Sequence, residues 1–230
     1  TRVCQPALYV HGCAVVAALR EQGRLPAFTA AAGLSLGELT AHAVAGTYDF
    51  ATGLRLVALR GRLMQEACDA TEGAMASLIG GDVPGARLLA EKHDVDLGNL
   101  NCPGQTVISG EKAKVEAAVA EAKAAGFKMA VPLKVAGAYH SRLMASACAG
   151  FEEALAEAVF QQPKVPVFTN TTGKVVDSPE AIKEALLRQI TSPVLWEDCF
   201  RGMMALGVCE FWECGTGNTL AGLAKRIDRE

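Results

Sequence analysis

The spacing of apolar side chains changes repeatedly along the chain between the period of a helix and the period of a strand. Helical spacing predicts helices over residues 5–21, 37–45, 50–70, 140–159 and 179–190, and two more that begin at Trp196 and Asn218. Short apolar runs predict strands over residues 27–32, around residues 165–170 and over residues 209–213. This alternation predicts an α/β fold with a mainly parallel sheet covered by helices.

A different order of elements occupies residues 73–135. Strands are predicted over residues 74–80, 95–101, 105–110 and 127–133, with helices over residues 84–93 and 111–126. This β-α-β-β-α-β order is that of the ferredoxin-like motif. The pattern therefore predicts a small ferredoxin-like domain at residues 73–135, inserted into a large α/β domain formed by residues 1–72 and 136–230.

The composition excludes several classes of partner. The chain has 230 residues and a formal net charge of −3, and its basic residues form no runs, so we predict no nucleic acid partner. We also predict no membrane span, because every apolar stretch falls short of the roughly 20 residues that cross a bilayer. The first residues, TRVCQPALYV, lack the anatomy of a signal peptide, and we therefore expect a cytoplasmic protein.

The eight cysteines are spread through the chain without a C-x-x-C pair. Zinc sites and redox motifs usually show such a spacing. Because most of these cysteines lie within apolar helical or strand patterns, we interpret them as small core residues in a reducing compartment and predict no metal site.

Residues 33–37 read GLSLG and fit the pattern G-x-S-x-G between a predicted strand and a predicted helix. In a nucleophile elbow, the serine occupies a strained turn and the helix N-terminus favours developing negative charge. Alternatively, Ser35 is an N-cap and Glu38, three residues later, completes a capping box. The local pattern does not decide between these two readings.

An arginine interrupts the apolar face of the helix predicted over residues 50–70. At about 100° per residue, the apolar stripe of this helix contains Leu56, Val57, Leu63, Met64 and Ala67. Arg60 lies in the middle of this stripe, whereas Arg55 and Arg62 project to the opposite side. A guanidinium that faces the interior keeps its charge and needs an anion or several acceptors. The partner is either a structural carboxylate such as Glu38 or the carboxylate of a substrate.

His140 is the histidine best placed to serve as a base for Ser35. It follows a predicted strand and a short flexible segment, at the seam between the two predicted domains, where a side chain can reach a cleft. Asp177, Glu197 and Asp198 are possible acidic partners, but the pattern favours none of them. We therefore predict a Ser-His dyad.

Taken together, these residues resemble the malonyl-CoA:acyl carrier protein transacylase family, the acyltransferases of fatty-acid and polyketide synthesis. The resemblance extends over essentially the whole chain. It rests on motifs in the same order, namely QPAL, GLSLGE, DFATGLRLVALRGRLMQEA, GAMASLIG, NCPGQTVISG, VAGAYHSRLM, RQITSPVLW and GTGNTLAGL. It implies a hydrolase-like α/β domain with a ferredoxin-like insertion and an active site between them.

The resemblance also assigns roles to individual residues. It makes Ser35 the acylated nucleophile, His140 its base and Arg60 the clamp on the malonyl carboxylate. It implies that the backbone carbonyl of Gln189 orients the histidine, which would explain why no acidic partner stands out. The backbone N–H of Leu36 would be an oxyanion donor, and Leu36 and Asn101 would contact the substrate.

The implied reaction is a ping-pong transfer of malonyl from malonyl-CoA to the phosphopantetheine thiol of an acyl carrier protein. The resemblance implies no cofactor, because the phosphopantetheine belongs to the partner protein. Two alternatives remain open: a serine esterase or thioesterase on the same scaffold, and an inactive fragment that binds carrier protein.

The sequence departs from the family pattern in two places. Leu34 stands before the nucleophile, where the family usually has histidine. The family's chain also begins earlier, with a strand and a Gly-Gln-Gly loop that supplies a second oxyanion donor. Loss of one such donor typically costs about 10²- to 10³-fold in rate, and loss of a central strand exposes sheet edge and apolar surface. We therefore expect the 230 residues to be a fragment that is inactive or poorly folded alone.

Overall fold

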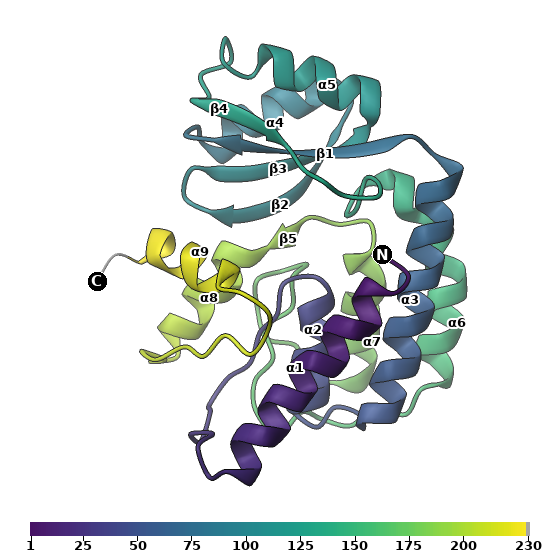
Figure 1. Cartoon of the computed structure of the whole chain (residues 1–230), viewed down its shortest axis with the longest axis vertical. Coiled ribbons are helices and arrows are strands. Elements are labelled where there is room, and N and C mark those ends of the chain that lie inside the picture. Colours follow the sequence, from purple (N-terminus) through teal and green to yellow (C-terminus); the bar gives the residue numbers. More distant parts are fainter. Residues whose placement is uncertain (229–230) are drawn as a thin grey trace.

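The computed structural model describes residues 1–228, which form a mixed α/β fold (Figure 1). The helices are α1 (Cys4–Glu21), α2 (Leu36–Val44), α3 (Phe50–Ala70), α4 (Val83–Lys92), α5 (Lys112–Glu121), η1 (Arg142–Ala147, a 3-10 helix), α6 (Cys148–Glu157), α7 (Pro179–Gln189), α8 (Trp196–Ala205) and α9 (Thr219–Ile227). The strands are β1 (Gly73–Ile79), β2 (Asp96–Cys102), β3 (Gln105–Glu111), β4 (Met129–Pro132) and β5 (Val194–Leu195).

The five strands form one sheet in the order β4-β1-β3-β2-β5. The first four strands pair antiparallel, and β5 joins β2 in parallel through Asn99–Val194 and Leu100–Leu195. Helices α4 and α5 cover the sheet on the side away from the helical part of the molecule (Figure 1). The strands and helices predicted within residues 73–135 are therefore present, but β5 comes from outside that range.

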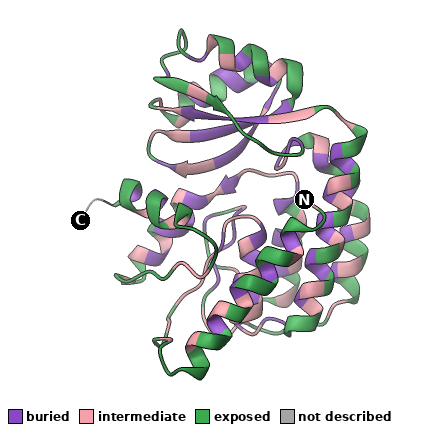
Figure 2. Ribbon diagram, in the orientation of Figure 1, coloured by how far each residue is buried: buried purple, intermediate pink, exposed green. Residues whose placement is uncertain are grey.

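The core consists of separate apolar clusters rather than one continuous layer. The largest lies among α1, α2, α3, η1, α6 and α7 and includes Tyr9, Leu39, Met64, Phe151 and Ile182. A second lies between the sheet and helices α4 and α5, and a third surrounds Trp196 and Phe200 beside α9. Figure 2 shows the buried residues concentrated on the inner faces of these elements.

Helix α3 connects the two parts of the molecule and carries Arg60 on its buried side. Its apolar stripe packs in the largest core cluster, with Leu56, Val57 and Met64 almost fully buried. At its start, the side chain of Asp49 accepts a hydrogen bond of 2.7 Å from the backbone N–H of Thr52. Asp49 is therefore the N-cap of α3, and the helix bounds predicted at residues 50–70 are confirmed.

The parallel sheet predicted for the larger part does not form within residues 1–228. The segments predicted as strands at 27–32 and 165–170 meet only at one parallel bridge, Ala31–Val167. The ladder does not continue beyond this bridge, because the next backbone acceptor is already used. The carbonyl of Gly33 accepts a hydrogen bond of 2.8 Å from the side-chain amide of Asn170 instead of from a neighbouring strand. Pro166 also has no N–H to give to a ladder.

The strand predicted at residues 209–213 is also absent from the described part of the chain. Side-chain contacts hold this segment as a loop: Phe211 stacks on Phe200 at 4.2 Å between ring centroids. The Glu213 carboxylate accepts the first free N–H groups of α9 from Leu220 and Ala221. An apolar run was therefore a poor guide here, since a strand also needs a paired backbone.

Two further sequence predictions need correction. The helix predicted at 140–159 begins only at Arg142, first as η1 and then as α6, because His140 has a φ of 58° that no right-handed helix accommodates. All eight cysteines are free, but Cys4 and Cys209 are exposed and are not core residues.

Among residues 1–228, no helix combines the length and apolar character needed to cross a membrane.

The N-cap of α3 leads to a test of stability. We expect Asp49→Ala to lower the free energy of unfolding by about 1 kcal/mol, because the N–H of Thr52 loses its acceptor. Asp69, exposed near the other end of α3, is the matched control, since an acidic residue at a helix C-terminus contributes little or is unfavourable. Thermal unfolding measures both variants, and equal effects would contradict the assignment of the cap.

Candidate active site

Ser35 lies at the turn into α2 with an unusual backbone conformation. Its φ is 54° and its ψ is −107°, in a region that L-residues other than glycine rarely occupy. Such strain persists only where the surrounding structure enforces it, and it clusters at functional sites. The side chain caps no N–H of the helix in the described structure, so the capping box with Glu38, one of the two readings left open by the sequence, is wrong.

Two residues hold the strained turn from either side. A Cβ on Gly33 would lie 2.0 Å from backbone atoms of Gly37, so the turn closes only with glycine at position 33. Asn170 bonds to both peptide groups: its side-chain oxygen accepts from the Ser35 N–H at 2.6 Å and its amide donates to Gly33 O. The turn is therefore stabilised by a residue remote in sequence.

His140 lies between the Ser35 hydroxyl and the end of α7. Its Nε2 is 2.8 Å from Ser35 Oγ, and its Nδ1 is 2.8 Å from the backbone oxygen of Gln189. A carbonyl oxygen only accepts, so Nδ1 carries the proton and Nε2 is free to accept from the hydroxyl. No carboxylate is needed at Nδ1, which accounts for the absence of a clear acidic partner in the sequence.

The environment keeps this imidazole neutral. Burial lowers the pKa of His140 to about 4, and the nearby charge of Arg60 acts in the same direction. A neutral imidazole is the form that can take a proton from serine. Gln189 is the last residue of α7, where carbonyl oxygens lack partners within the helix and the dipole favours positive charge. The same carbonyl would therefore stabilise the imidazolium once it forms.

Arg60 is buried beside the hydroxyl, as its place in the apolar stripe predicts. Its guanidinium donates to Ser35 Oγ at 3.1 Å, to the side-chain oxygen of Gln189 at 2.8 Å and to that of Gln5 at 2.5 Å. Burial lowers the pKa of Arg60 to about 10, so the group is still charged at neutral pH.

The direct ion pair between Arg60 and Glu38, one of the two predicted alternatives, does not form. The side-chain amide of Gln189 lies between them, with its oxygen on the guanidinium and its nitrogen 2.6 Å from the carboxylate. Among the ion pairs of the described residues, none includes Arg60. The positive charge therefore meets neutral acceptors only.

Leu36 and Asn101 occupy different parts of the site region. Leu36 is the first residue of α2, where the first N–H groups have no partner within the helix, and it directly follows Ser35. Asn101 lies on β2, and its buried side-chain oxygen has no hydrogen-bond partner among residues 1–228. The structure brings together Ser35, His140, Arg60 and Gln189, and it adds no contact from Asn101 to them.

Sequence reasoning missed three polar groups of the site: the side chains of Gln5, Asn170 and Gln189. Gln5 could have been found, because it shares the buried face of α1 with Tyr9 and Val16, as Arg60 shares that of α3. The other two carry no comparable local signal.

Leu34 precedes Ser35, at the position where the resembled family usually has histidine. Leu34 is partly buried and packs against the apolar cluster around Phe168 and Trp196. A leucine there is satisfied by packing alone, without a hydrogen bond.

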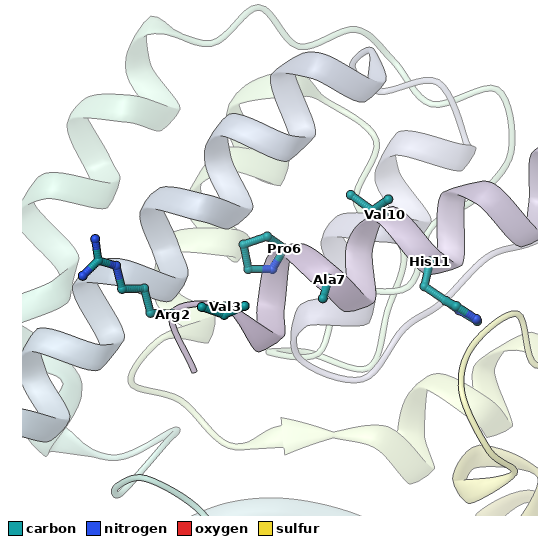
Figure 3. Close-up of a pocket in the computed structure, with 6 residues that line it drawn as sticks. All are labelled: Arg2, Val3, Pro6, Ala7, Val10 and His11. Carbon is teal, nitrogen blue, oxygen red and sulfur yellow. The ribbon is translucent and has the colours of Figure 1, made fainter.

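A separate hollow lies on the outer side of α1 (Figure 3). It is lined by Arg2, Val3, Pro6, Ala7, Val10 and His11. Its lining is apolar between Arg2 and His11, and it includes neither Ser35 nor His140.

Among the residues that the structure describes, no group of three or more His, Cys, Asp or Glu side chains is arranged to hold a metal ion.

Comparison with known proteins places the chain among acyltransferases. Residues 1–214 match the acyl transferase domain family. A malonyl CoA-acyl carrier protein transacylase of Bacillus subtilis is 41% identical over 230 residues, covering 98% of this chain and 72% of that protein. The Escherichia coli K12 protein of the same name is 42% identical over 228 residues, covering 97% of this chain and 73% of the relative.

Solved structures agree with this. The malonyl CoA-acyl carrier protein transacylase of Coxiella burnetii superposes with a TM-score of 0.96 at 36% identity, over 100% of this chain and 74% of that one. A malonyl-transacylase in complex with its type II PKS acyl-carrier protein gives a TM-score of 0.93 at 40% identity, over 100% and 75% of the two chains.

The two glycines beside Ser35 provide a matched test of the strained turn. We expect Gly33→Ala to lower the free energy of unfolding by about 2 kcal/mol or more, because the added methyl meets backbone atoms. For Gly37→Ala, the added methyl meets no described atom within 4 Å apart from its chain neighbours and the backbone of its own helix, so stability should stay within about 1 kcal/mol of wild type. Chemical denaturation distinguishes the two, and a harmless Gly33→Ala would contradict the turn geometry.

The environment of His140 makes a prediction for NMR. The imidazole should titrate near pH 4, because burial and Arg60 both lower its pKa. In Arg60→Met this pKa should rise, since the repulsion from the guanidinium is lost while the burial remains. A His140 pKa at the ordinary value of about 6.5 in the wild-type protein would contradict the described burial.

Proposed function

The chain belongs to the acyl transferase domain family, and from that membership we infer that it transfers malonyl from malonyl-CoA to the phosphopantetheine thiol of an acyl carrier protein. The family predicted from the sequence motifs is thereby confirmed. The roles of individual residues in this reaction are proposals that rest on the geometry of the site.

One observation carries the assignment of the substrate: a buried guanidinium lies 3.1 Å from the hydroxyl of Ser35 and has no carboxylate as its own partner in the described chain. In a malonyl thioester, one methylene separates the reacting carbonyl from a free carboxylate. An acyl group attached at Ser35 would therefore place that carboxylate within reach of Arg60, which can bind it through two parallel N–H donors.

The first half of the proposed reaction forms an ester on Ser35. His140 Nε2 takes the hydroxyl proton as Ser35 Oγ attacks the thioester carbonyl, and the carbon–sulfur bond then breaks. We assign the oxyanion donor to the N–H of Leu36, which is the first residue of α2 and has no partner within the helix. His140 returns the proton to the departing thiolate, and free coenzyme A leaves.

The second half runs the same steps with a different thiol. The phosphopantetheine thiol of the carrier protein gives its proton to His140 and attacks the malonyl-serine ester. The ester bond breaks, Ser35 recovers its proton from His140, and malonyl leaves on the carrier protein. Coenzyme A leaves with the proton that Ser35 gave up, and Ser35 regains a proton from the carrier-protein thiol through His140. The protons therefore balance over the two halves, and the proposed reaction includes no resident cofactor.

Finer aspects of the fold belong to the same proposal. We propose that β1–β4 with α4 and α5 form a ferredoxin-like domain, which their strand order β4-β1-β3-β2 supports, inserted into a hydrolase-like domain. A cytoplasmic location is a further proposal, supported by eight cysteines that are all free.

Arg60 and Arg62 provide a matched test of the substrate assignment. Both lie on α3, but Arg60 is buried beside Ser35 whereas Arg62 is exposed and pairs with Glu66. Hydrogen bonds to charged groups are worth roughly 1.5 to 3 kcal/mol each, so Arg60→Ala should slow malonyl transfer to carrier protein by about tenfold to a hundredfold. Acetyl transfer, which has no carboxylate to lose, should fall much less.

The controls make this test specific. Arg62→Ala should keep the wild-type rates, and Ser35→Ala should abolish transfer with either acyl group. If Arg60→Ala kept the wild-type preference for malonyl over acetyl, Arg60 would not bind the carboxylate. Release of free malonate at the rate of thioester loss, without transfer, would favour a thioesterase instead.

A further inference from the structure

A carboxyl group that the proposed reaction does not use is buried directly beneath the site. Glu38 lies in the first turn of α2, three residues after Ser35, and is fully buried. Its Oε2 accepts two hydrogen bonds, at 2.6 Å from the Gln189 amide and at 2.9 Å from the backbone N–H of Asn170. Its Oε1 has no hydrogen-bond partner among residues 1–228.

Gln189 connects this carboxyl group to the reacting groups. Its side-chain nitrogen donates to Glu38 and to the backbone oxygen of Ser35 at 3.0 Å, and its side-chain oxygen accepts from Arg60. Its backbone oxygen meets His140. The orientation of one amide therefore decides whether Arg60 faces an oxygen or an NH₂ group.

Asn170 makes the second connection. Its backbone N–H is held by Glu38, and its side chain holds the peptide groups on both sides of the strained turn at Ser35. The same carboxylate oxygen thus anchors both the amide that contacts Arg60 and the residue that fixes the nucleophile.

We propose that Glu38 is a positioning residue of the transfer reaction, because its ionised carboxylate orients the side-chain amide of Gln189. The oriented amide turns its oxygen to Arg60 and so holds the guanidinium beside the acyl group on Ser35. This inference rests on the proposed function and extends it to a residue that touches neither the substrate nor the nucleophile's hydroxyl.

The hydrogen-bond inventory explains why the ionised form is needed. Two donors converge on Oε2, and a carboxylate accepts both. In the protonated form, a hydrogen on Oε2 would point at those donors, whereas a hydrogen on Oε1 would leave Oε2 a neutral carbonyl oxygen, which accepts more weakly than a carboxylate. Either arrangement weakens the hold on Gln189, so protonation of Glu38 should loosen Arg60.

The groups around Glu38 allow its titration to be isolated. Arg60 faces it from α3, Cys199 from α8 and Tyr48 from the turn before α3, and His140 is reached through Gln189. Burial raises the pKa of Glu38 to about 7, whereas the pKa of Cys199 rises to about 12 and that of Tyr48 rises well above its ordinary value. Arg60 and His140 have pKa values of about 10 and about 4. Between pH 5 and about 9, Glu38 is therefore the member of this set that changes charge.

The test is the pH dependence of Ser35 acylation by malonyl-CoA in a single turnover, followed by intact-protein mass between pH 5 and 9. In the wild-type protein, the rate should rise about tenfold through a step centred near pH 7, as Glu38 ionises. Glu38→Gln keeps the shape and one acceptor oxygen but cannot ionise, so its rate should be flat with pH and about tenfold below the wild-type plateau. Glu153→Gln, an exposed change on α6, should behave as wild type.

A double-mutant cycle tests the route through the amide. Gln189→Met removes the side-chain amide but leaves the backbone oxygen that meets His140. Each single change, Glu38→Gln or Gln189→Met, should lower the malonyl-to-acetyl rate ratio several-fold. If Glu38 acts through the amide, adding Glu38→Gln to Gln189→Met should change this ratio further by less than twofold. Circular dichroism verifies the fold of each variant. If Glu38→Gln does not fold, Gln189→Met carries the test, since it too should lose the step near pH 7.

The outcomes separate the two proposals. Wild-type protein that forms no malonyl adduct on Ser35 would overturn the proposed function and this inference with it. The role of Glu38 alone would be overturned if Ser35 of the wild-type protein is acylated but either of two results is found. In the first, the Glu38→Gln rate keeps the step near pH 7; in the second, the effects in the double-mutant cycle are additive.

Discussion

A buried guanidinium beside a serine hydroxyl is the constraint on which the site depends. Arg60 keeps its charge in the interior, so the surrounding elements must supply acceptors: Gln5 from α1, Gln189 from α7 and the hydroxyl of Ser35. All three acceptors are neutral. The site can therefore stay folded without a substrate while its positive charge is left available, and an acyl group with its own carboxylate is the ligand that this arrangement favours.

Helix ends supply the rest of the chemistry. Ser35 precedes the N-terminus of α2, where free N–H groups favour an oxyanion, and His140 meets the C-terminus of α7, where a free carbonyl favours an imidazolium. In the proposed reaction, the negative and positive charges that form together would thus each develop at the helix end that stabilises them. On this proposal, a Ser-His dyad can catalyse the transfer without an acidic third residue, because the carbonyl of Gln189 would both orient the imidazole and offset its charge.

Patterns within single elements predicted much of this arrangement. The apolar stripe of α3 located Arg60, the G-x-S-x-G turn located Ser35, and a strand-to-helix junction located His140. The contacts that complete the site join distant segments, such as Asn170 to Ser35 across 135 positions and Gln189 to Ser35 across 154. Local periodicity carries no information about such pairs. The same limit explains the strand predicted at residues 27–32, where an apolar run is present but pairing with residues 165–170 stops at one bridge.

The central claim is that Ser35 carries the malonyl group between the two thiols. The most direct measurement is the intact mass of the protein after brief exposure to malonyl-CoA, followed by peptide mapping and by addition of carrier protein. The account predicts one malonyl adduct on the peptide that contains Ser35, stable in buffer and lost when the carrier protein gains the same mass. An adduct on any other residue, or an adduct that carrier protein does not remove, would contradict it.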